Sequence, residues 1–140
     1  MPAFPSHRPR NLSLGPLETE ILELLWRLEP TTARAIHESI LADIDRELTY
    51  SSVATVLRRL EHKGWVSGRR VGRAFVWQTC VSQEHAEVLR SQQQLQAFLD
   101  VSDPDIVAAF ADTIDEASIT QLEAITERIR AAKQAREAQA

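Results

Sequence analysis

The segment from residue 49 to residue 73 gathers two kinds of side chain that bind phosphate: short hydroxyls and guanidinium groups. The hydroxyls come first, and six basic residues follow between positions 58 and 73, where Glu61 is the only acid. Guanidinium groups pair with phosphate oxygens and with guanine edges, and small hydroxyl side chains permit close approach to a duplex. The backbone N–H groups at the start of a helix, here near Tyr50, can also hold a phosphate. The residues that we assign to phosphate or duplex binding are Thr49, Tyr50, Ser51, Ser52, Thr55, Arg58, Arg59, Arg69, Arg70 and Arg73.

The distribution of charge along the chain supports a phosphate-binding surface near the N-terminal half. The net charge is −4 overall, but residues 1–80 sum to +2 and residues 81–140 to −6. A local basic patch can bind nucleic acid while the acidic remainder limits indiscriminate association. A solvated charge run is the alternative, because such runs are common on surfaces. A second alternative is a module that contacts a protein instead of DNA, although protein-docking surfaces usually place aromatic residues at their centre.

Three helices and a hairpin are predicted to position these side chains. The first helix begins at Pro16 and ends before Pro30, and the second is capped by Thr31 or Thr32 and ends near Asp43. The third runs from a Thr49 cap to a Gly64 stop. Two β-prone runs, 65–70 and 73–78, follow with Gly72 at a tight turn. This order predicts a mainly α fold with a small antiparallel β-hairpin, a winged helix-turn-helix.

The remainder of the chain predicts a helical region that holds two copies together. Residues 1–12 are expected to be a flexible arm, 13–80 the winged helix, 81–132 the dimerisation helices and 133–140 a frayed end. The pattern Ser118-Ile-Thr-Gln121 predicts the start of the last helix. Short amphipathic helices need a partner for their apolar faces. The residues expected at the dimer contact are Leu89, Leu95, Phe98, Leu99, Ile106, Val107, Phe110, Leu122, Ile125 and Ile129.

Enzyme and metal chemistry find little support in the sequence. The four histidines and Cys80 are scattered without the spacing of zinc ligands, so we expect neither metal nor cofactor. Neither a glycine-rich phosphate loop nor a nucleophile elbow occurs, so we expect that the chain is not an enzyme. No apolar run reaches the length of a membrane span, which predicts no membrane insertion and, with the single cysteine, a cytoplasmic protein.

Three segments resemble the penicillinase-repressor (BlaI/MecI/CopY) family of winged-helix transcriptional regulators. They are LGPLETEILELLW at 14–26, LTYSSVATVLRRLEHKGWV at 48–66 and GRAFVWQ at 72–78, within a resemblance that covers roughly residues 12–130. The resemblance implies a homodimeric repressor that places its third helix in the major groove of palindromic operator DNA. It assigns Thr49, Ser51, Ser52, Thr55 and Arg58 to the recognition face and Arg73 to the wing.

Two departures from the family pattern concern specificity and control. Ala54 stands where better-known members carry a longer polar residue, so base preference is expected to differ. The family's β-lactamase repressors are inactivated when the protease of a membrane sensor system cuts an Asn-Phe peptide. The matching residues here are Ala109-Phe110, which keep the Phe and lack the Asn. The cysteine pairs of the copper-responsive branch are absent.

Overall fold

The computed structural model describes residues 7–101 and 103–139. Contacts divide the chain into two units, one ending at Gln96 and the other beginning at Ala97. The observed boundary therefore lies later than the one expected near residue 80, because the start of the fourth helix belongs to the first unit. Val81, Ala86 and Leu89 are buried in the core of that unit.

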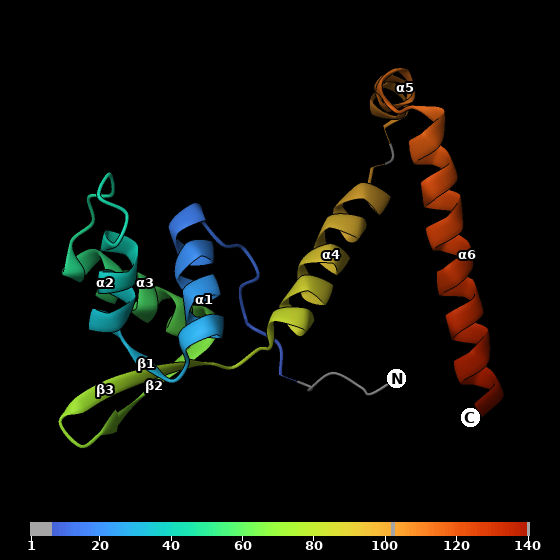
Figure 1. The fold of residues 1–140 in the computed structure, drawn as a ribbon. Coiled ribbons are helices and arrows are strands. Elements are labelled where there is room, and N and C mark those ends of the chain that lie inside the picture. The colour runs from blue at the N-terminus through green and yellow to red at the C-terminus, as the bar shows by residue number, and fades with distance from the viewer. Residues whose placement is uncertain (1–6, 102, 140) are drawn as a thin grey trace. The chain divides into compact units, whose positions relative to one another are not determined.

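The first unit is a winged helix, which confirms the predicted fold class. Three helices precede a hairpin, and the hairpin extends beyond the helices (Figure 1). A short strand that the sequence did not predict lies between the first two helices. The elements are α1 (Pro16–Leu28), β1 (Thr31–Thr32), α2 (Ala33–Leu41), α3 (Tyr50–Lys63), β2 (Val66–Val71), β3 (Ala74–Thr79) and α4 (Gln83–Leu99).

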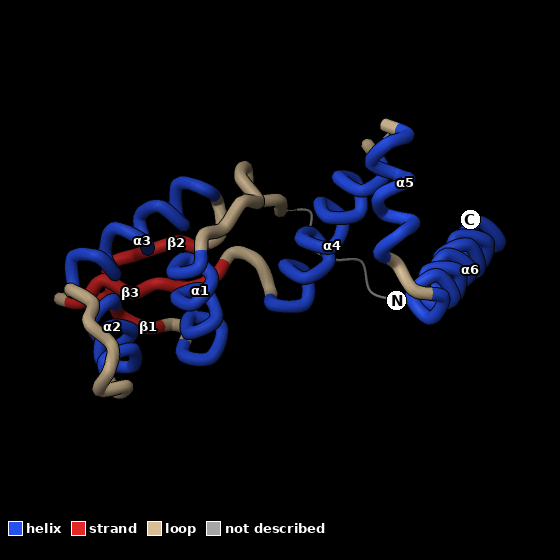
Figure 2. Tube along the Cα trace, turned by 90° about the horizontal axis from the view of Figure 1, so that it is seen from above, coloured by secondary structure: helices blue, strands red, loops and turns tan. Residues whose placement is uncertain are grey.

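The sheet has three antiparallel strands in the order β1-β3-β2. β1 pairs with β3 through Thr31 opposite Trp77 and Thr32 opposite Val76. In Figure 2 α3 lies beside β2 at one edge of the sheet, and α2 lies beside β1 at the other. The sheet thus holds the wing, which is the hairpin of β2 and β3, between α3 and α2.

Local signals set both ends of α3. The Thr49 hydroxyl accepts a hydrogen bond from the Ser52 N–H at 3.1 Å, which caps the start of the helix. Gly64 ends it in the left-handed conformation, with φ of 91°. A Cβ at Gly64 would lie 3.1 Å from the Cα of Pro9, so both its conformation and its surroundings favour glycine. Both ends agree with the sequence prediction.

The wing closes through a two-residue loop. Val71 pairs with Ala74, which leaves Gly72 and Arg73 as the loop, and Gly72 has φ of 61°. A positive φ at this position fits the tight turns that match the strand twist. Arg73 is therefore at the tip of the hairpin and not in the second strand, where the run 73–78 predicts it.

One continuous core supports α3 from beneath. It contains residues of α1, α2, α3, the start of α4 and the hairpin, and Trp65 is its largest fully buried side chain. The α3 residues that enter it repeat at helical spacing, which fixes which side of α3 remains exposed. Its fully buried side chains are Ile21, Leu22, Leu25, Ile36, Val53, Leu57, Leu60 and Trp65.

The connection between α2 and α3 is held by two polar contacts. Arg46 donates to both carboxylate oxygens of Glu20 on α1, at 2.6 and 2.8 Å. The His37 Nε2 donates to the carbonyl of Leu48 at 2.6 Å. A bidentate pair restricts the guanidinium more than a single bond would. These contacts fix the segment that leads directly into α3.

The Glu20–Arg46 pair predicts a pH-dependent contribution to stability. The hydrogen bonds from Arg46 hold the pKa of Glu20 below its ordinary value. A depressed folded-state pKa gives stability that is present above the unfolded pKa and lost as pH falls through the folded value. We expect Arg46→Met to be less stable than the wild type near pH 6, and this difference to shrink below about pH 4. Urea unfolding at both pH values measures it, and a difference that does not change with pH would contradict the assignment.

Residues 7–13 lie against the first unit, where the sequence predicted a loose arm. The Trp65 Nε1 donates to the carbonyl of Asn11 at 2.9 Å, and the Asn11 N–H donates to the carbonyl of Lys63 at 3.3 Å. Pro9 is buried. These contacts of residues 7–12 were not expected from the sequence, because α3 and Trp65 supply partners that no local pattern reveals. The rest of the predicted arm lies outside the described residues.

The second unit contains the end of α4, α5 (Pro104–Thr113) and α6 (Glu116–Gln139). The rings of Phe98 and Phe110 lie 5.3 Å apart. α6 begins two residues before the predicted cap, because the Asp115 carboxylate accepts from the Ser118 N–H at 2.7 Å. It continues to Gln139 although a frayed end was expected from residue 133. Alanine and long charged residues, which dominate that stretch, are good helix formers.

Within the described residues, none of the helices is both long enough and apolar enough to cross a membrane.

Candidate nucleic-acid interface

The outward face of α3 carries a polar stripe opposite its core face. Ser51, Thr55, Arg58 and His62 follow one another at spacings of four, three and four residues, and all are exposed. Residues at these spacings lie on one side of a helix. The stripe therefore presents two hydroxyls, a guanidinium and an imidazole along one line. Its opposite side is the buried face made of Val53, Val56, Leu57 and Leu60.

The remaining hydroxyls at the start of α3 stabilise the helix end. The Thr49 Oγ1 lies 2.8 Å from the Ser52 Oγ and 3.2 Å from the Ser51 Oγ. Ser52 is half-buried, whereas Thr49 and Ser51 are exposed. Of the predicted hydroxyls, Ser51 and Thr55 thus face outward along the stripe, and Thr49 and Ser52 mainly hold the N-terminus in shape.

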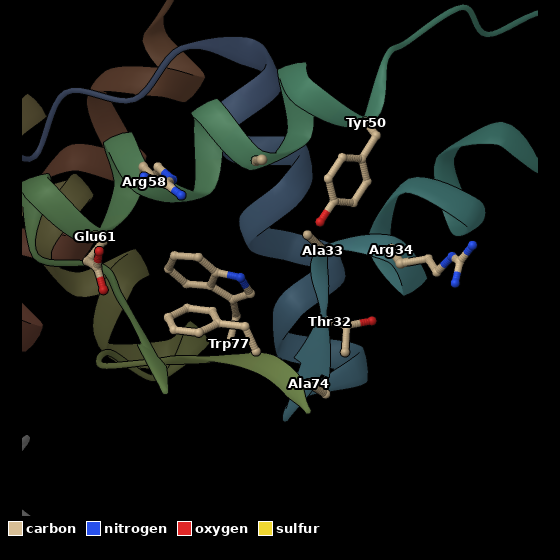
Figure 3. A pocket seen from close by; sticks show the side chains of 10 residues that line it. Thr32, Ala33, Arg34, Tyr50, Arg58, Glu61, Ala74 and Trp77 are labelled. Atoms are coloured by element: carbon tan, nitrogen blue, oxygen red, sulfur yellow. The ribbon is translucent and has the colours of Figure 1, made fainter. Parts of the chain in front are cut away.

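Tyr50 leaves α3 on the side that faces α2. Its ring meets the ring of His37 edge-on, with centroids 6.2 Å apart. In Figure 3 it reaches from the start of α3 toward Ala33 at the start of α2. Tyr50 is exposed, but it does not belong to the outward stripe.

The wing arginines do not share one surface, contrary to the sequence interpretation. Arg69 pairs with Val76 and Arg70 with Phe75, and consecutive strand residues point to opposite faces. Arg70 shares a face with Trp77, the face that packs toward α3. Arg69 lies on the other face, and Arg73 occupies the exposed tip. Of the three, Arg70 and Arg73 are therefore the ones placed to act together with α3.

An open groove of about 580 Å³ separates α3 from the wing (Figure 3). The rings of Phe75 and Trp77, 5.2 Å apart, contribute its apolar side, and Arg58 contributes a cation from α3. The Glu61 carboxylate lies on the same side of α3 and accepts from the Gly68 N–H at 3.4 Å. This contact links the end of α3 to the hairpin.

Close packing between β2 and β3 explains the glycine at position 68. A Cβ there would lie 2.3 Å from the Phe75 ring, so a larger residue would push that ring aside. The absence of a side chain at Gly68 thus allows the aromatic side of the groove to form.

Lys63 does not take part in this surface, although the sequence counted it within the basic cluster. Its ammonium pairs with the Glu18 carboxylate at 2.8 Å and donates to the carbonyl of Ser13 at 2.7 Å. The side chain is 16% exposed. Five exposed arginines remain near α3 and the wing, and none of them forms an ion pair with a carboxylate in the described part of the chain: Arg58, Arg59, Arg69, Arg70 and Arg73.

Two exposed features near this surface escaped the sequence analysis. His62 follows Arg58 by four residues, a spacing that would have placed it on the stripe. Arg8 and Arg10 precede α1 and had no local signal, because their position depends on the docking of the arm. Among the described residues, no cluster of His, Cys, Asp and Glu side chains is suited to hold a metal ion.

The predicted dimer residues separate into one that is buried and nine that are exposed. Leu89 is 4% exposed and belongs to the core of the first unit, so its assignment to a dimer contact is wrong. Ala109 and Phe110 lie within α5 and are exposed. Cleavage between them stays a prediction. The nine others are between 45% and 62% exposed: Leu95, Phe98, Leu99, Ile106, Val107, Phe110, Leu122, Ile125 and Ile129.

Two curated relatives match less than half of the chain. "Transcriptional regulator BlaI" of Mycobacterium tuberculosis, in strains CDC 1551 and H37Rv, is 45% identical over 62 residues, which is 44% of this chain and 44% of each relative. The aligned part thus spans less than half the length of these relatives.

Among solved structures, RosR of H. salinarum is 20% identical, with a TM-score of 0.45, over 72% of this chain and 96% of its own. FabT of Streptococcus pneumoniae, solved in complex with DNA, is 14% identical, with a TM-score of 0.43, over 86% of this chain and 77% of its own.

The family model described as "Penicillinase repressor" matches residues 14–131, which include α1 to β3, α4, α5 and the larger part of α6. This match confirms the resemblance inferred from the three sequence segments, and it agrees with the prediction that the chain is not an enzyme. The chain belongs to the penicillinase repressor family.

Proposed function

We propose that this protein is a sequence-specific transcriptional repressor that places the outward face of α3 in the major groove of duplex DNA. The observation that carries the proposal is the stripe of Ser51, Thr55, Arg58 and His62, which is exposed and opposite the core. The major groove is about 12 Å wide and admits one helix. Small hydroxyls near the start of α3 let it approach base edges, and Arg58 can reach guanine or phosphate.

In this proposal the wing supplies affinity and α3 supplies selectivity. Arg70 and Arg73 lie on the part of the hairpin nearest α3 and at its tip, and both are exposed. Contacts from such arginines to the sugar-phosphate backbone neutralise charge without reading sequence. Bound in this way, the protein would repress transcription by blocking access to a promoter. We also propose that it resides in the cytoplasm, where its DNA lies.

We further propose that the repressor is a homodimer held by the tail, which is the segment from the end of α4 through α6. The nine exposed apolar side chains lie from the end of α4 through α6, and water would hydrate them in a single chain. A second copy offers the same apolar surface, as a twofold-symmetric contact requires. Two winged helices related by that twofold axis would meet an inverted repeat, with half-sites about one helical turn or a multiple apart.

Selection of genomic DNA fragments by the purified full-length protein tests both parts of this proposal. We expect enrichment of an inverted repeat close to a promoter. Enrichment of one unpaired half-site would contradict the dimer while leaving DNA binding intact. If no duplex is retained even at low salt, DNA binding itself is contradicted, and the alternative of a protein-interaction module takes its place.

A further inference from the structure

The N-terminal arm has an anchored side and a cationic side. Three features anchor it: buried Pro9, Asn11 bonded to α3 and Trp65, and the carbonyl of Ser13 bonded to Lys63. Arg8 and Arg10 flank Pro9 and are both exposed. Alternation of one buried and two exposed residues is typical of an extended segment lying on a surface.

The His7 side chain adds a further anchor at the end of α3. Its Nε2 donates to the carbonyl of Gly64 at 2.8 Å. Figure 2 shows the segment that leads into α1 passing beside this end of α3. The position of Arg8, between His7 and Pro9, is therefore fixed by contacts on both sides of it.

The arm and the wing contact opposite sides of α3. Arg58, Ala54 and Glu61 line the groove that faces the hairpin. The Lys63 side chain donates to the carbonyl of Ser13 in the arm, and Lys63 lies one turn after Arg59, so these two residues share the other side of α3. The outward stripe runs between the two sides. A helix that enters a groove along this stripe would have the wing on one flank and the arm on the other.

The charge on the arm flank is available for binding. Arg8, Arg10 and Arg59 are exposed, and none of them pairs with a carboxylate within residues 7–101 and 103–139. The one lysine nearby, Lys63, is already neutralised by Glu18. Three unpaired guanidiniums on one flank favour a polyanion, and beside α3 that polyanion is the DNA backbone.

We propose that the arm is a second DNA-binding element, with Arg8 and Arg10 contacting phosphates that flank the groove occupied by α3. The inference rests on the proposed function, since it assumes that α3 meets duplex DNA. Arg8 and Arg10 lie before residues 14–131, which the family model matches. The arm would lengthen the footprint of each protomer and strengthen binding irrespective of base sequence.

The test compares full-length variants by fluorescence anisotropy with a mixed-sequence 30-base-pair duplex at several salt concentrations. Two lost phosphate contacts should lower the slope of log affinity against log salt by about 1.8, and should weaken binding about 10-fold or more at 0.1 M salt. We expect this for the double variant Arg8→Ala/Arg10→Ala. The matched control Arg27→Ala/Arg90→Ala removes two exposed arginines outside the arm, α3 and the wing, and should keep the wild-type slope.

The outcomes separate the arm from the proposed function. If the wild type binds and Arg58→Ala weakens it, but the arm variant behaves like its control, the arm inference is overturned and the function stands. If the slope of log affinity against log salt falls by the same amount in both double variants, net charge explains the effect and the arm inference is again overturned. If the wild type does not bind the duplex at any salt concentration, both proposals fail. The melting temperature of the double variant Arg8→Ala/Arg10→Ala should equal that of the wild type, since the Arg8 and Arg10 side chains have no partner among the described residues.

Discussion

Replacing Trp65 with alanine is expected to lower the free energy of unfolding by about 3–5 kcal/mol. The side chain is 0% exposed and lies where α3, β2 and the arm meet. Its removal leaves a cavity in the core and leaves the carbonyl of Asn11 without the indole donor. Denaturant unfolding measures the loss directly.

A second substitution at the same position separates packing from hydrogen bonding. Trp65→Phe keeps much of the ring and removes the N–H that bonds Asn11, so we expect a loss of about 1–2 kcal/mol. If Trp65→Ala is no less stable than Trp65→Phe, the packing account is wrong. If Trp65→Phe matches the wild type, the bond to the arm contributes nothing to folding.

Replacing Arg58 with alanine is expected to weaken duplex binding by about 10-fold and to reduce the salt slope by about 0.9. Arg58 is exposed in the middle of the stripe and beside the groove, and it has no carboxylate partner among the described residues. Stability should not change, because the side chain contributes nothing to the core. Salt-dependent anisotropy titration reports both values.

The variant Arg58→Lys distinguishes a phosphate contact from a guanine contact. Lysine keeps the charge but lacks the planar pair of donors that reads the guanine edge. If Arg58 binds phosphate, Arg58→Lys should have the wild-type salt slope and most of the wild-type affinity, in contrast to Arg58→Ala. If it reads guanine, the slope returns while discrimination between operator and mixed-sequence DNA stays reduced. Unchanged binding in both Arg58→Ala and Arg73→Ala would contradict the assignment of this surface to DNA.

Features set by neighbours in the sequence could be predicted. The ends of α3 follow from Thr49 and Gly64, because a cap hydroxyl and a left-handed glycine act within one helical turn. The exposed stripe follows from helical spacing once the core face is known. His62 belongs to that stripe by the same rule and could have been found in the same way.

Features set by distant partners could not be predicted. β1 has two residues and no periodicity, and it exists because β3, more than forty residues later, pairs with it. Lys63 was counted as a surface cation, but Glu18 and Ser13 draw it inward. Leu89 has the spacing of an interface residue, yet the first unit buries it. In each case the deciding partner lies too far along the chain for local patterns to show.

The central claim is that the outward face of α3 touches DNA, and site-specific photo-crosslinking tests it most directly. A photo-reactive amino acid in place of Thr55 is expected to crosslink to the bound duplex, whereas the same group in place of exposed Glu87 on α4 is expected not to. Crosslinks from position 87 with none from position 55 would contradict this account of how the protein meets DNA.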